Sequence, residues 1–255
     1  MITKKTPEDI AILKEGGKRH AHILSVISRM VDVGVSTNAL NEKAMELIRE
    51  GGDVAAFLHY TPEGAKRPYP AALCVSVNDE IVHGIPNENP AILKDGDVVS
   101  IDLGLSHMGL ITDAAVTIGV GKVSAEDRKL IEGTKEALYA GIKEARGGGR
   151  LGDIGAAIEA VAKRLSLELA EGLAEHGVGY EVHEDPYVPN TGIAGKGEKL
   201  VAGMVIAIEP MLVQGKGAIV LEKDGYTFRT RDGKKAAHFE HTILITDGDP
   251  IILTK

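Results

Sequence analysis

The chain has 255 residues, of which 44% are hydrophobic and 4% aromatic, and its formal net charge is −8. This length allows one large domain or two fused halves with a sizeable core, and the acidic charge argues against nucleic acid as the main ligand. A single cysteine, Cys74, excludes an internal disulfide, and the first nine residues lack the apolar segment of a signal peptide. The longest apolar stretch, 201–212, is interrupted by Gly203 and Glu209 and is too short to span a membrane.

The beginning of the chain predicts two helices. Residues 6–9 (TPED) place a hydroxyl cap, a proline and two acids where a helix begins. Apolar residues at helical spacing continue this pattern, and we expect Gly34 to close the helix. Residues 36–38 (STN) cap a second helix, which the glycines at 51–52 end.

A strand is expected at 71–77, after a loop rich in Pro and Tyr, and a hairpin follows at 98–118. If residues 106–109 (SHMG) form the hairpin loop, counting outward places Asp102 opposite Asp113. Directly opposed residues of an antiparallel pair have Cβ atoms about 4.5–5.5 Å apart, and like charges there are destabilising. Two aspartates at that spacing share either a proton or a cation.

The second half follows the same order. Residues 124–127 (SAED) cap a helix, three glycines at 147–149 form a flexible corner, and a further helix is expected at 151–169. The glycines are not a phosphate loop, because no Gly-Lys-Ser/Thr sequence follows them. The last third predicts strands at 201–213, 218–221, 226–230 and 237–246.

Two segments repeat each other, and each ends in a carboxylate. Residues 93–102 (LKDGDVVSID) and 200–209 (LVAGMVIAIE) share Leu, Gly, Val and Ile in place. Likewise, 239–245 matches 112–118, with an acid (Glu240 or Asp113) before an apolar run. Ionised acids beside apolar strands are costly to bury unless paired, so a shared cation is the simplest explanation. Four carboxylates neutralise two divalent ions, and oxygen ligands with one or two imidazoles suit Mn, Fe, Co or Zn.

Three of the nine histidines stand out. His83, His176 and His183 each lie in a turn punctuated by Gly or Pro, where the backbone can approach a ligand closely. The other histidines are expected to be surface or capping residues: His20, His22, His59, His107, His238 and His241.

Several of these residues belong to short motifs that occur in a fixed order. The motifs are His-Gly-Ile-Pro at 83–86, Ile-Asp at 101–102 with a second Asp at 113, His-Gly-Val-Gly at 176–179, His-Glu-Asp-Pro at 183–186, Ile-Glu-Pro-Met at 208–211 and Phe-Glu-His-Thr at 239–242. Together they resemble the type I methionine aminopeptidases, and the likeness covers nearly the whole chain. The resemblance implies an α/β (α+β) pita-bread fold with pseudo-two-fold symmetry, a curved antiparallel sheet core and helices on its outer face. We expect one catalytic domain, 1–255, made of two similar halves, about 1–120 and 121–255.

The resemblance also implies an enzyme that removes the initiator methionine from nascent proteins through a hydroxide held between two divalent ions. Asp102 would bind one ion in bidentate fashion, Asp113 and Glu240 would bridge both ions, and His176 and Glu209 would complete the other site. The ions would be Co, Mn, Fe or Zn.

The same resemblance assigns catalytic and substrate-binding roles. Glu209 would shuttle a proton, His183 would polarise the scissile carbonyl, and His83 would bind near the scissile amide and help the leaving amine. With His83 and His183, the pocket for the first substrate residue would be lined by Phe57, Tyr60, Tyr69, Cys74, Val182 and Tyr226. An apolar slot of this kind suits an unbranched thioether.

The chain departs from the family pattern at a few positions. Glu175 stands where the family generally has glycine, Val182 where it has phenylalanine, and Tyr226 where it has tryptophan. The loop between Tyr60 and Tyr69 is longer than is typical. The predicted metal ligands are all present.

The partners implied are the N-termini of nascent polypeptides, with transient ribosome association, no specific nucleic acid and no membrane; the chain would be a cytoplasmic monomer. An Xaa-Pro aminopeptidase or dipeptidase of the same fold is an alternative, because residues 178–184 (VGYEVHE) resemble that branch. A non-catalytic binding module on this scaffold is a second alternative. A Ser-His-Asp hydrolase has no Gly-x-Ser-x-Gly support in the chain.

Overall fold

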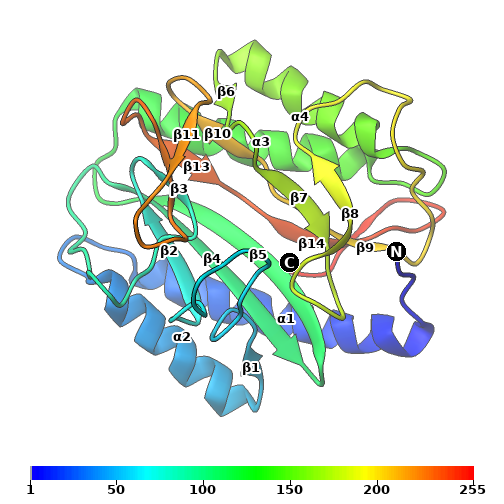
Figure 1. Ribbon diagram of the computed structural model, residues 1–255, viewed down its shortest axis with the longest axis horizontal. Helices are drawn as coiled ribbons and strands as arrows, with labels where there is room; N and C mark the ends of the chain where they lie inside the picture. The colour runs from blue at the N-terminus through cyan, green and yellow to red at the C-terminus, as the bar shows by residue number, and fades with distance from the viewer. Residues whose placement is uncertain (1) are drawn as a thin grey trace.

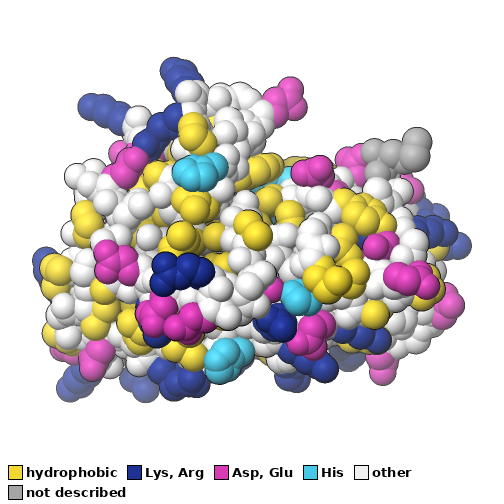
Figure 2. Space-filling view, turned by 90° about the horizontal axis from the view of Figure 1, so that it is seen from below, with side chains coloured by type: hydrophobic (Ala, Val, Ile, Leu, Met, Phe, Trp, Pro, Cys, Tyr) yellow, Lys and Arg dark blue, Asp and Glu magenta, His cyan; other side chains and the backbone are white. Residues whose placement is uncertain are grey.

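Two pairs of helices lie at opposite ends of a set of antiparallel strands in the computed structural model, which describes residues 2–255 (Figure 1). The helices are α1 (Pro7–Met30), α2 (Thr37–Gly51), α3 (Ala125–Glu144) and α4 (Leu151–Leu165). Within the described residues, no helix has both the length and the apolar character needed to cross a lipid bilayer. Acidic and basic side chains are interspersed over the face seen in Figure 2.

The helix starts follow the sequence, whereas two helix ends are earlier than predicted. Reciprocal capping boxes begin α1 at Thr6 and α3 at Ser124. Helix α1 stops at Met30 rather than at Gly34, because the Asp32 carboxylate accepts the Val33 N–H and competes with helical bonding. Helix α4 stops at Leu165, where a left-handed Ser166 ends it.

The strands are mostly short. They are β1 (Val54–Ala55), β2 (Leu73–Val77), β3 (Glu80–Val82), β4 (Val98–His107), β5 (Leu110–Gly119), β6 (Glu168–Leu169), β7 (Ala174–Gly177), β8 (Glu184–Pro189), β9 (Val205–Ile208), β10 (Met211–Val213), β11 (Ile219–Leu221), β12 (Phe228–Thr230), β13 (Ala236–His238), β14 (His241–Leu244) and β15 (Ile251–Ile252). They pair antiparallel in the orders β1-β4-β2 with β5 on β4, β13-β10-β6, β11-β12-β3 and β15-β14-β9-β7-β8.

The hairpin of β4 and β5 has a different register from the one predicted. Its turn is the two-residue pair Met108 and Gly109, both with positive φ, which matches the right-handed twist of the strands. Asp102 therefore lies opposite Ala115, and Asp113 lies opposite Gly104. The two aspartates are diagonal neighbours on one face of the pair rather than directly opposed.

Two strands that the sequence predicts as continuous are broken at their acids. The predicted strand 201–213 is split into β9 and β10 at Glu209, and 237–246 is split into β13 and β14 at Glu240. Pro210 has no N–H to donate at this point, which explains the gap in the ladder. The register continues across the break, with Ile208 opposite His241 and Met211 opposite His238 in the two flanking ladders. Both glutamates thus stand at the same irregularity.

Each half has its own apolar core. In the first half, Ile, Leu, Val and Ala side chains from α1, α2, β2, β4 and β5 pack together, and in the second half those from α3, α4, β9, β10, β13 and β14 do so. Val116 of β5 packs against both cores. Burying each Val, Leu or Ile side chain contributes about 1.5–3 kcal/mol, so aliphatic residues build these cores without tryptophan.

The halves meet along β5 and residues 238–242, which we call the seam. At its centre Ala115 and Glu240 exchange backbone hydrogen bonds of 3.3 and 2.9 Å. Thr242 Oγ1 accepts the Asp113 N–H at 2.8 Å and donates to the Asp113 carbonyl at 2.7 Å. The seam therefore holds the backbone of two predicted metal ligands from different halves.

His20 generates a prediction about acid stability. It is fully buried in α1, its Nδ1 lies 3.0 Å from Thr112 Oγ1, and burial lowers its pKa to about 3. In the unfolded chain this histidine takes up a proton as the pH falls below 6.5, whereas in the folded chain it does so only near pH 3. The free energy of unfolding is therefore highest above pH 6.5 and decreases as the pH falls below that value. Between pH 7 and pH 5, urea denaturation should show that His20→Gln loses about 2 kcal/mol less stability than the native protein. The exposed His22→Gln serves as the control, and equal losses for all three proteins would contradict the prediction.

Candidate metal and substrate site

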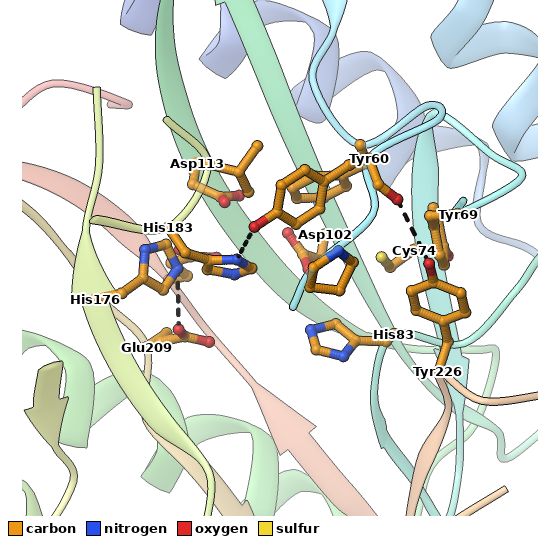
Figure 3. Close-up of a pocket in the computed structure, with 14 residues that line it drawn as sticks. Tyr60, Tyr69, Cys74, His83, Asp102, Asp113, His176, His183, Glu209 and Tyr226 are labelled. Atoms are coloured by element: carbon orange, nitrogen blue, oxygen red, sulfur yellow. Dashed lines mark hydrogen bonds and ion pairs between the residues drawn. The ribbon is translucent and has the colours of Figure 1, made fainter. Parts of the chain in front are cut away.

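One pocket brings together every residue that the sequence assigns to the site (Figure 3). Its lining consists of Phe57, Tyr60, Pro62, Tyr69, Cys74, His83, Asp102, Asp113, His176, Val182, His183, Glu209, Tyr226 and Glu240. Pro62 is the one lining residue that the sequence did not suggest. In Figure 3 the histidines 176 and 183 lie with Glu209 at one end of the pocket, and the aromatic residues 69 and 226 lie at the other.

The four predicted carboxylate ligands are buried and come from both halves. Asp102 and Asp113 project from β4 and β5, whereas Glu209 and Glu240 stand at the strand breaks. Burial raises the pKa of Asp102 to about 6 and the pKa of Asp113 well above its usual value. The negative charge of Glu209 adds to the rise at Asp102, and that of Asp102 adds to the rise at Asp113. Burial also raises the pKa of Glu240, and the negative charge of Asp113 is the next largest cause of the rise.

Glu209 differs from the other three acids. Burial raises its pKa, but the neighbouring imidazoles, His238 first among them, outweigh burial and hold the pKa below its usual value. One oxygen, Oε1, lies 3.4 Å from His176 Nε2, and the other, Oε2, lies 3.2 Å from His238 Nε2. Glu209 is therefore the acid of this cluster that stays ionised most readily.

The donor set fits a divalent cation. Asp102 Oδ1, Asp113 Oδ1 and Glu240 Oε1 are buried and have no hydrogen-bond partner within residues 2–255. Buried polar atoms are rarely left without partners, and carboxylate oxygens in such a cluster need a positive charge between them. The oxygen-rich donor set with imidazole nitrogen is typical of Mn, Fe, Co or Zn sites.

His176 is oriented for binding through Nε2. It lies in β7, opposite Ala207 of β9, and its Nδ1 contacts the carbonyl of Gly177 at 2.9 Å. A ring N–H at Nδ1 that donates to a carbonyl leaves the lone pair on Nε2 free to face the acids.

His183 stands in the bend between β7 and β8, beside His176. Their ring centroids are 4.4 Å apart, and Tyr60 Oη lies 2.9 Å from His183 Nδ1. Burial, and then the neighbouring His176, lower the pKa of His183 to about 3. The imidazole is thus neutral at physiological pH, and the tyrosine hydroxyl determines which ring nitrogen faces the pocket.

His83 is held by an unusual backbone. Its φ is +60°, and the next residue, Gly84, approaches the β2 backbone so closely that a Cβ would lie 2.3 Å from the Val75 carbonyl oxygen. Gly84 N–H donates to Ser76 Oγ at 3.1 Å, which fixes this turn. Burial lowers the pKa of His83 to about 4, against the opposite influence of Glu209.

An apolar slot adjoins the acids. Phe57, Tyr69, Cys74, Val182 and Tyr226 pack as one cluster, and the rings of the tyrosines 69 and 226 meet edge to face with centroids 5.1 Å apart. Cys74 lies opposite Asp102 in the β2–β4 ladder. Burial raises the pKa of this cysteine well above its usual value, so the thiol is neutral and acts as a small apolar side chain, as the sequence suggests.

Comparison with known proteins identifies the family. The model of metallopeptidase family M24 matches residues 11–247. The chain is 44% identical to the methionine aminopeptidase of Aquifex aeolicus over 249 residues, which is 97% of this chain and 96% of that protein. It is 40% identical to methionine aminopeptidase 1 of Bacillus subtilis over the whole of both chains.

The chain belongs to metallopeptidase family M24, and within it to the type I methionine aminopeptidases. The crystal structure of the Thermotoga maritima methionine aminopeptidase superimposes with a TM-score of 0.95, at 39% identity and full coverage of both chains. The predicted pita-bread fold is therefore confirmed. The Pyrococcus horikoshii prolidase, at 21% identity and a TM-score of 0.76, shares the fold, and this chain covers 63% of its length.

The loop that carries His183 in this M24 chain is tied to the N-terminal segment. The fully buried ammonium of Lys5 lies 2.7 Å from Glu184 Oε2, and Thr3 Oγ1 donates to the same oxygen at 2.6 Å. The Lys5 ammonium also lies 4.1 Å from the ring centroid of Tyr180. These contacts hold the loop from both of its ends.

Two acidic or basic residues near the ligands were missed or left without a role by the sequence analysis. His238, expected to be a surface or capping residue, lies beside Glu209 and 3.9 Å from Glu240 Oε2. Its place two residues before Glu240 was the available signal, because alternate residues of a strand share a face. Glu175 is fully buried, and its Oε1 accepts the Glu209 N–H at 3.1 Å. Burial, and then the negative charge of Glu209, raise the pKa of Glu175 well above its usual value.

Substitution of Asp113 tests the metal site of this family member. Asp113→Asn should weaken binding of Mn²⁺ or Co²⁺ by at least about 100-fold, because it removes a carboxylate from the centre of the cluster. In the metal-free protein the same change should raise the melting temperature, because it removes a buried acid that Asp102 repels. Equilibrium dialysis and thermal melts measure the two effects, with the exposed Asp247→Asn as control. Normal metal affinity of Asp113→Asn would refute its assignment as a ligand.

Proposed function

We propose that this chain removes the N-terminal methionine from nascent polypeptides, using two divalent ions held between its halves. The observation that carries the proposal is the pocket itself, where buried carboxylate oxygens that have no hydrogen-bond partner within residues 2–255 adjoin an apolar slot. Relatives that match the chain from end to end are named methionine aminopeptidases, which supports the same substrate. The proposed unit is one catalytic domain, because ligands from about 1–120 and about 121–255 face the same pocket.

We assign the predicted ligands to the two ions as follows. Asp102, Asp113 and Glu240 would hold one ion, and Asp113, Glu240, His176 and Glu209 would hold the other. Two groups of donor atoms, each with all atoms within 4.8 Å of one another, bear on this assignment: Asp113, His176 and Glu240 form one, and Glu209, His238 and Glu240 form the other. Glu240 belongs to both groups, which supports its place between the two ions. Neither group contains Asp102, and the second contains His238, which the motifs do not assign to the site. When bound, divalent ions of this kind lower the pKa of water and supply positive charge to a developing oxyanion.

His183 serves as a hydrogen-bond donor to the scissile carbonyl. The Tyr60 hydroxyl lies 2.9 Å from His183 Nδ1, and we assign it as the donor, which places the ring proton on Nε2. A neutral imidazole in this tautomer donates to the carbonyl oxygen and stabilises the negative charge that develops there. Because the pKa of His183 is about 3, this donor does not titrate near neutral pH.

Glu209 and His83 handle protons on the two sides of the scissile bond. Glu209 remains ionised, so it can accept a proton from the attacking water and pass it on. His83 stands at the junction of the acid cluster and the slot, where the leaving amine would form. Its neutral ring, with a pKa of about 4, orients this amine by hydrogen bonding.

The apolar slot selects the first residue of the substrate. Its walls are Phe57, Tyr60, Tyr69, Cys74, Val182 and Tyr226. Cys74 lies on β2 directly opposite Asp102, so a side chain in the slot sits next to the acids that act on its own peptide bond. A flexible, unbranched thioether fills such a slot without a buried polar group to satisfy. We further propose that the protein acts as a cytoplasmic monomer in transient contact with the ribosome.

Peptide cleavage separates this proposal from its alternatives. With Mn²⁺ or Co²⁺ bound, the protein should release methionine from Met-Ala-Ser and leave Ala-Pro-Ala intact, as followed by liquid chromatography of the products. Faster cleavage of Ala-Pro-Ala would favour the Xaa-Pro aminopeptidase alternative. Absence of turnover on both peptides, at full metal occupancy, would favour a binding module. Asp113→Asn provides the inactive control.

Tyr60 gives a prediction specific to this geometry. Tyr60→Phe keeps the ring in the slot and removes the hydroxyl that sets the His183 tautomer. Losing one hydrogen bond of about 1 kcal/mol should lower kcat for Met-Ala-Ser about fivefold. Metal affinity should not change, because Tyr60 is not a ligand. A variant with native kcat would show that the hydroxyl does not orient His183.

A further inference from the structure

We infer that His238 is an additional metal ligand, which supplies Nε2 to the ion held by Glu209 and Glu240. This inference rests on the proposed function, because it assumes ions between these acids. It concerns a residue that neither the motifs nor the pocket lining assigns to the site.

The contacts of His238 are those of a donor that shares one ion with its neighbours. Its side chain is buried, and Nε2 lies 3.2 Å from Glu209 Oε2 and 3.9 Å from Glu240 Oε2. Ligands bound at about 2.0–2.2 Å to one ion stand about 3–4 Å from each other. Within residues 2–255, neither ring nitrogen of His238 meets the geometry of a hydrogen bond, so Nε2 lies beside the Glu209 oxygen without pointing at it.

The seam places His238 and Asp113 in equivalent positions. Thr242 Oγ1 accepts from the Asp113 N–H and donates to the Asp113 carbonyl, at 2.8 and 2.7 Å. Thr117 Oγ1 does the same for His238, accepting from its N–H at 2.9 Å and donating to its carbonyl at 2.6 Å. The approximate two-fold axis that relates the two halves therefore also relates Asp113 to His238.

The sheet register supports the same equivalence in the first half. Asp113 pairs with Gly104, two residues after Asp102. This places the Asp113 side chain diagonal to that of Asp102 on one face of the hairpin.

The second half repeats this arrangement. His238 pairs with Met211, two residues after Glu209. His238 therefore stands to Glu209 as Asp113 stands to Asp102. The sequence pattern that matched Asp113 with Glu240 is off by two residues, because the seam pairs Glu240 with Ala115. The second half thus carries a donor at the Asp113 position, and this donor is an imidazole.

An added nitrogen ligand changes which metals bind best. Imidazole suits Zn, Co, Ni and Cu better than Mn, in line with the Irving–Williams order. We expect His238→Gln to lower Zn²⁺ and Co²⁺ affinity by at least about 100-fold, with a clearly smaller effect on Mn²⁺. The exposed His22→Gln should bind all three ions as the native protein does.

Proton NMR of the Co²⁺-loaded protein counts the ligating histidines directly. Each imidazole bound through Nε2 gives one strongly shifted ring N–H signal that disappears in D₂O. The native protein should show two such signals, and His176→Gln and His238→Gln should each show one. The remaining His176 signal in His238→Gln shows that this variant is folded and loaded.

The outcomes separate this inference from the function beneath it. One signal in the native protein, lost in His176→Gln and kept in His238→Gln, would overturn the inference and leave the metal site intact. This count holds even if His238→Gln does not fold, because it is made on the native protein. Absence of shifted signals together with absence of bound Co²⁺ by elemental analysis would overturn the metal site as well.

Discussion

Mutual repulsion among buried acids is the constraint on which this structure depends. Asp102, Asp113, Glu209 and Glu240 face one pocket, and Glu175 lies buried beneath them. Two like charges 4 Å apart cost about 4 kcal/mol at an effective dielectric constant of 20, so full ionisation of the cluster without cations would cancel much of a domain's stability. Burial, and then the negative charge of a neighbouring acid, raise the pKa values of Asp113, Glu175 and Glu240.

The fold brings these acids together by joining its halves at a seam rather than by burying them inside either half. Asp113 is held by Thr242 of the other half, and Glu240 pairs through its backbone with Ala115. Because each contact crosses between the halves, neither half presents a complete ligand set alone. The separate apolar cores supply most of the stability, which leaves the seam free to carry polar groups that contribute little to it.

Residue chemistry and local caps were readable from the sequence, whereas register was not. The helix starts at Thr6 and Ser124 follow from their capping boxes, and the acids and histidines of the pocket follow from their motifs. The predicted pairing of Asp102 with Asp113 was wrong, because the sequence around Met108 is compatible with both a two-residue turn and a four-residue loop. The backbone hydrogen bonds between β4 and β5 show that the turn has two residues.

The role of His238 was missed for a related reason. An alignment of the two half-sequences by residue type places acid opposite acid, so it matches Glu240 with Asp113. In the structure, Thr117 bonds to His238 in the way that Thr242 bonds to Asp113. The residue equivalent to Asp113 is therefore His238, two positions before Glu240. A break in the strand at Pro210, which lacks an N–H, is also invisible to periodicity.

The Lys5–Glu184 pair has a practical consequence for anyone who works with this protein. A fully buried ammonium near the start of the chain contacts Glu184 and Tyr180 on either side of His183, so the first residues brace the loop that carries this histidine. Fusion partners, purification tags and protease scars placed there would disturb this support. The far end, at the exposed Lys255, is the better attachment point for immobilisation or display.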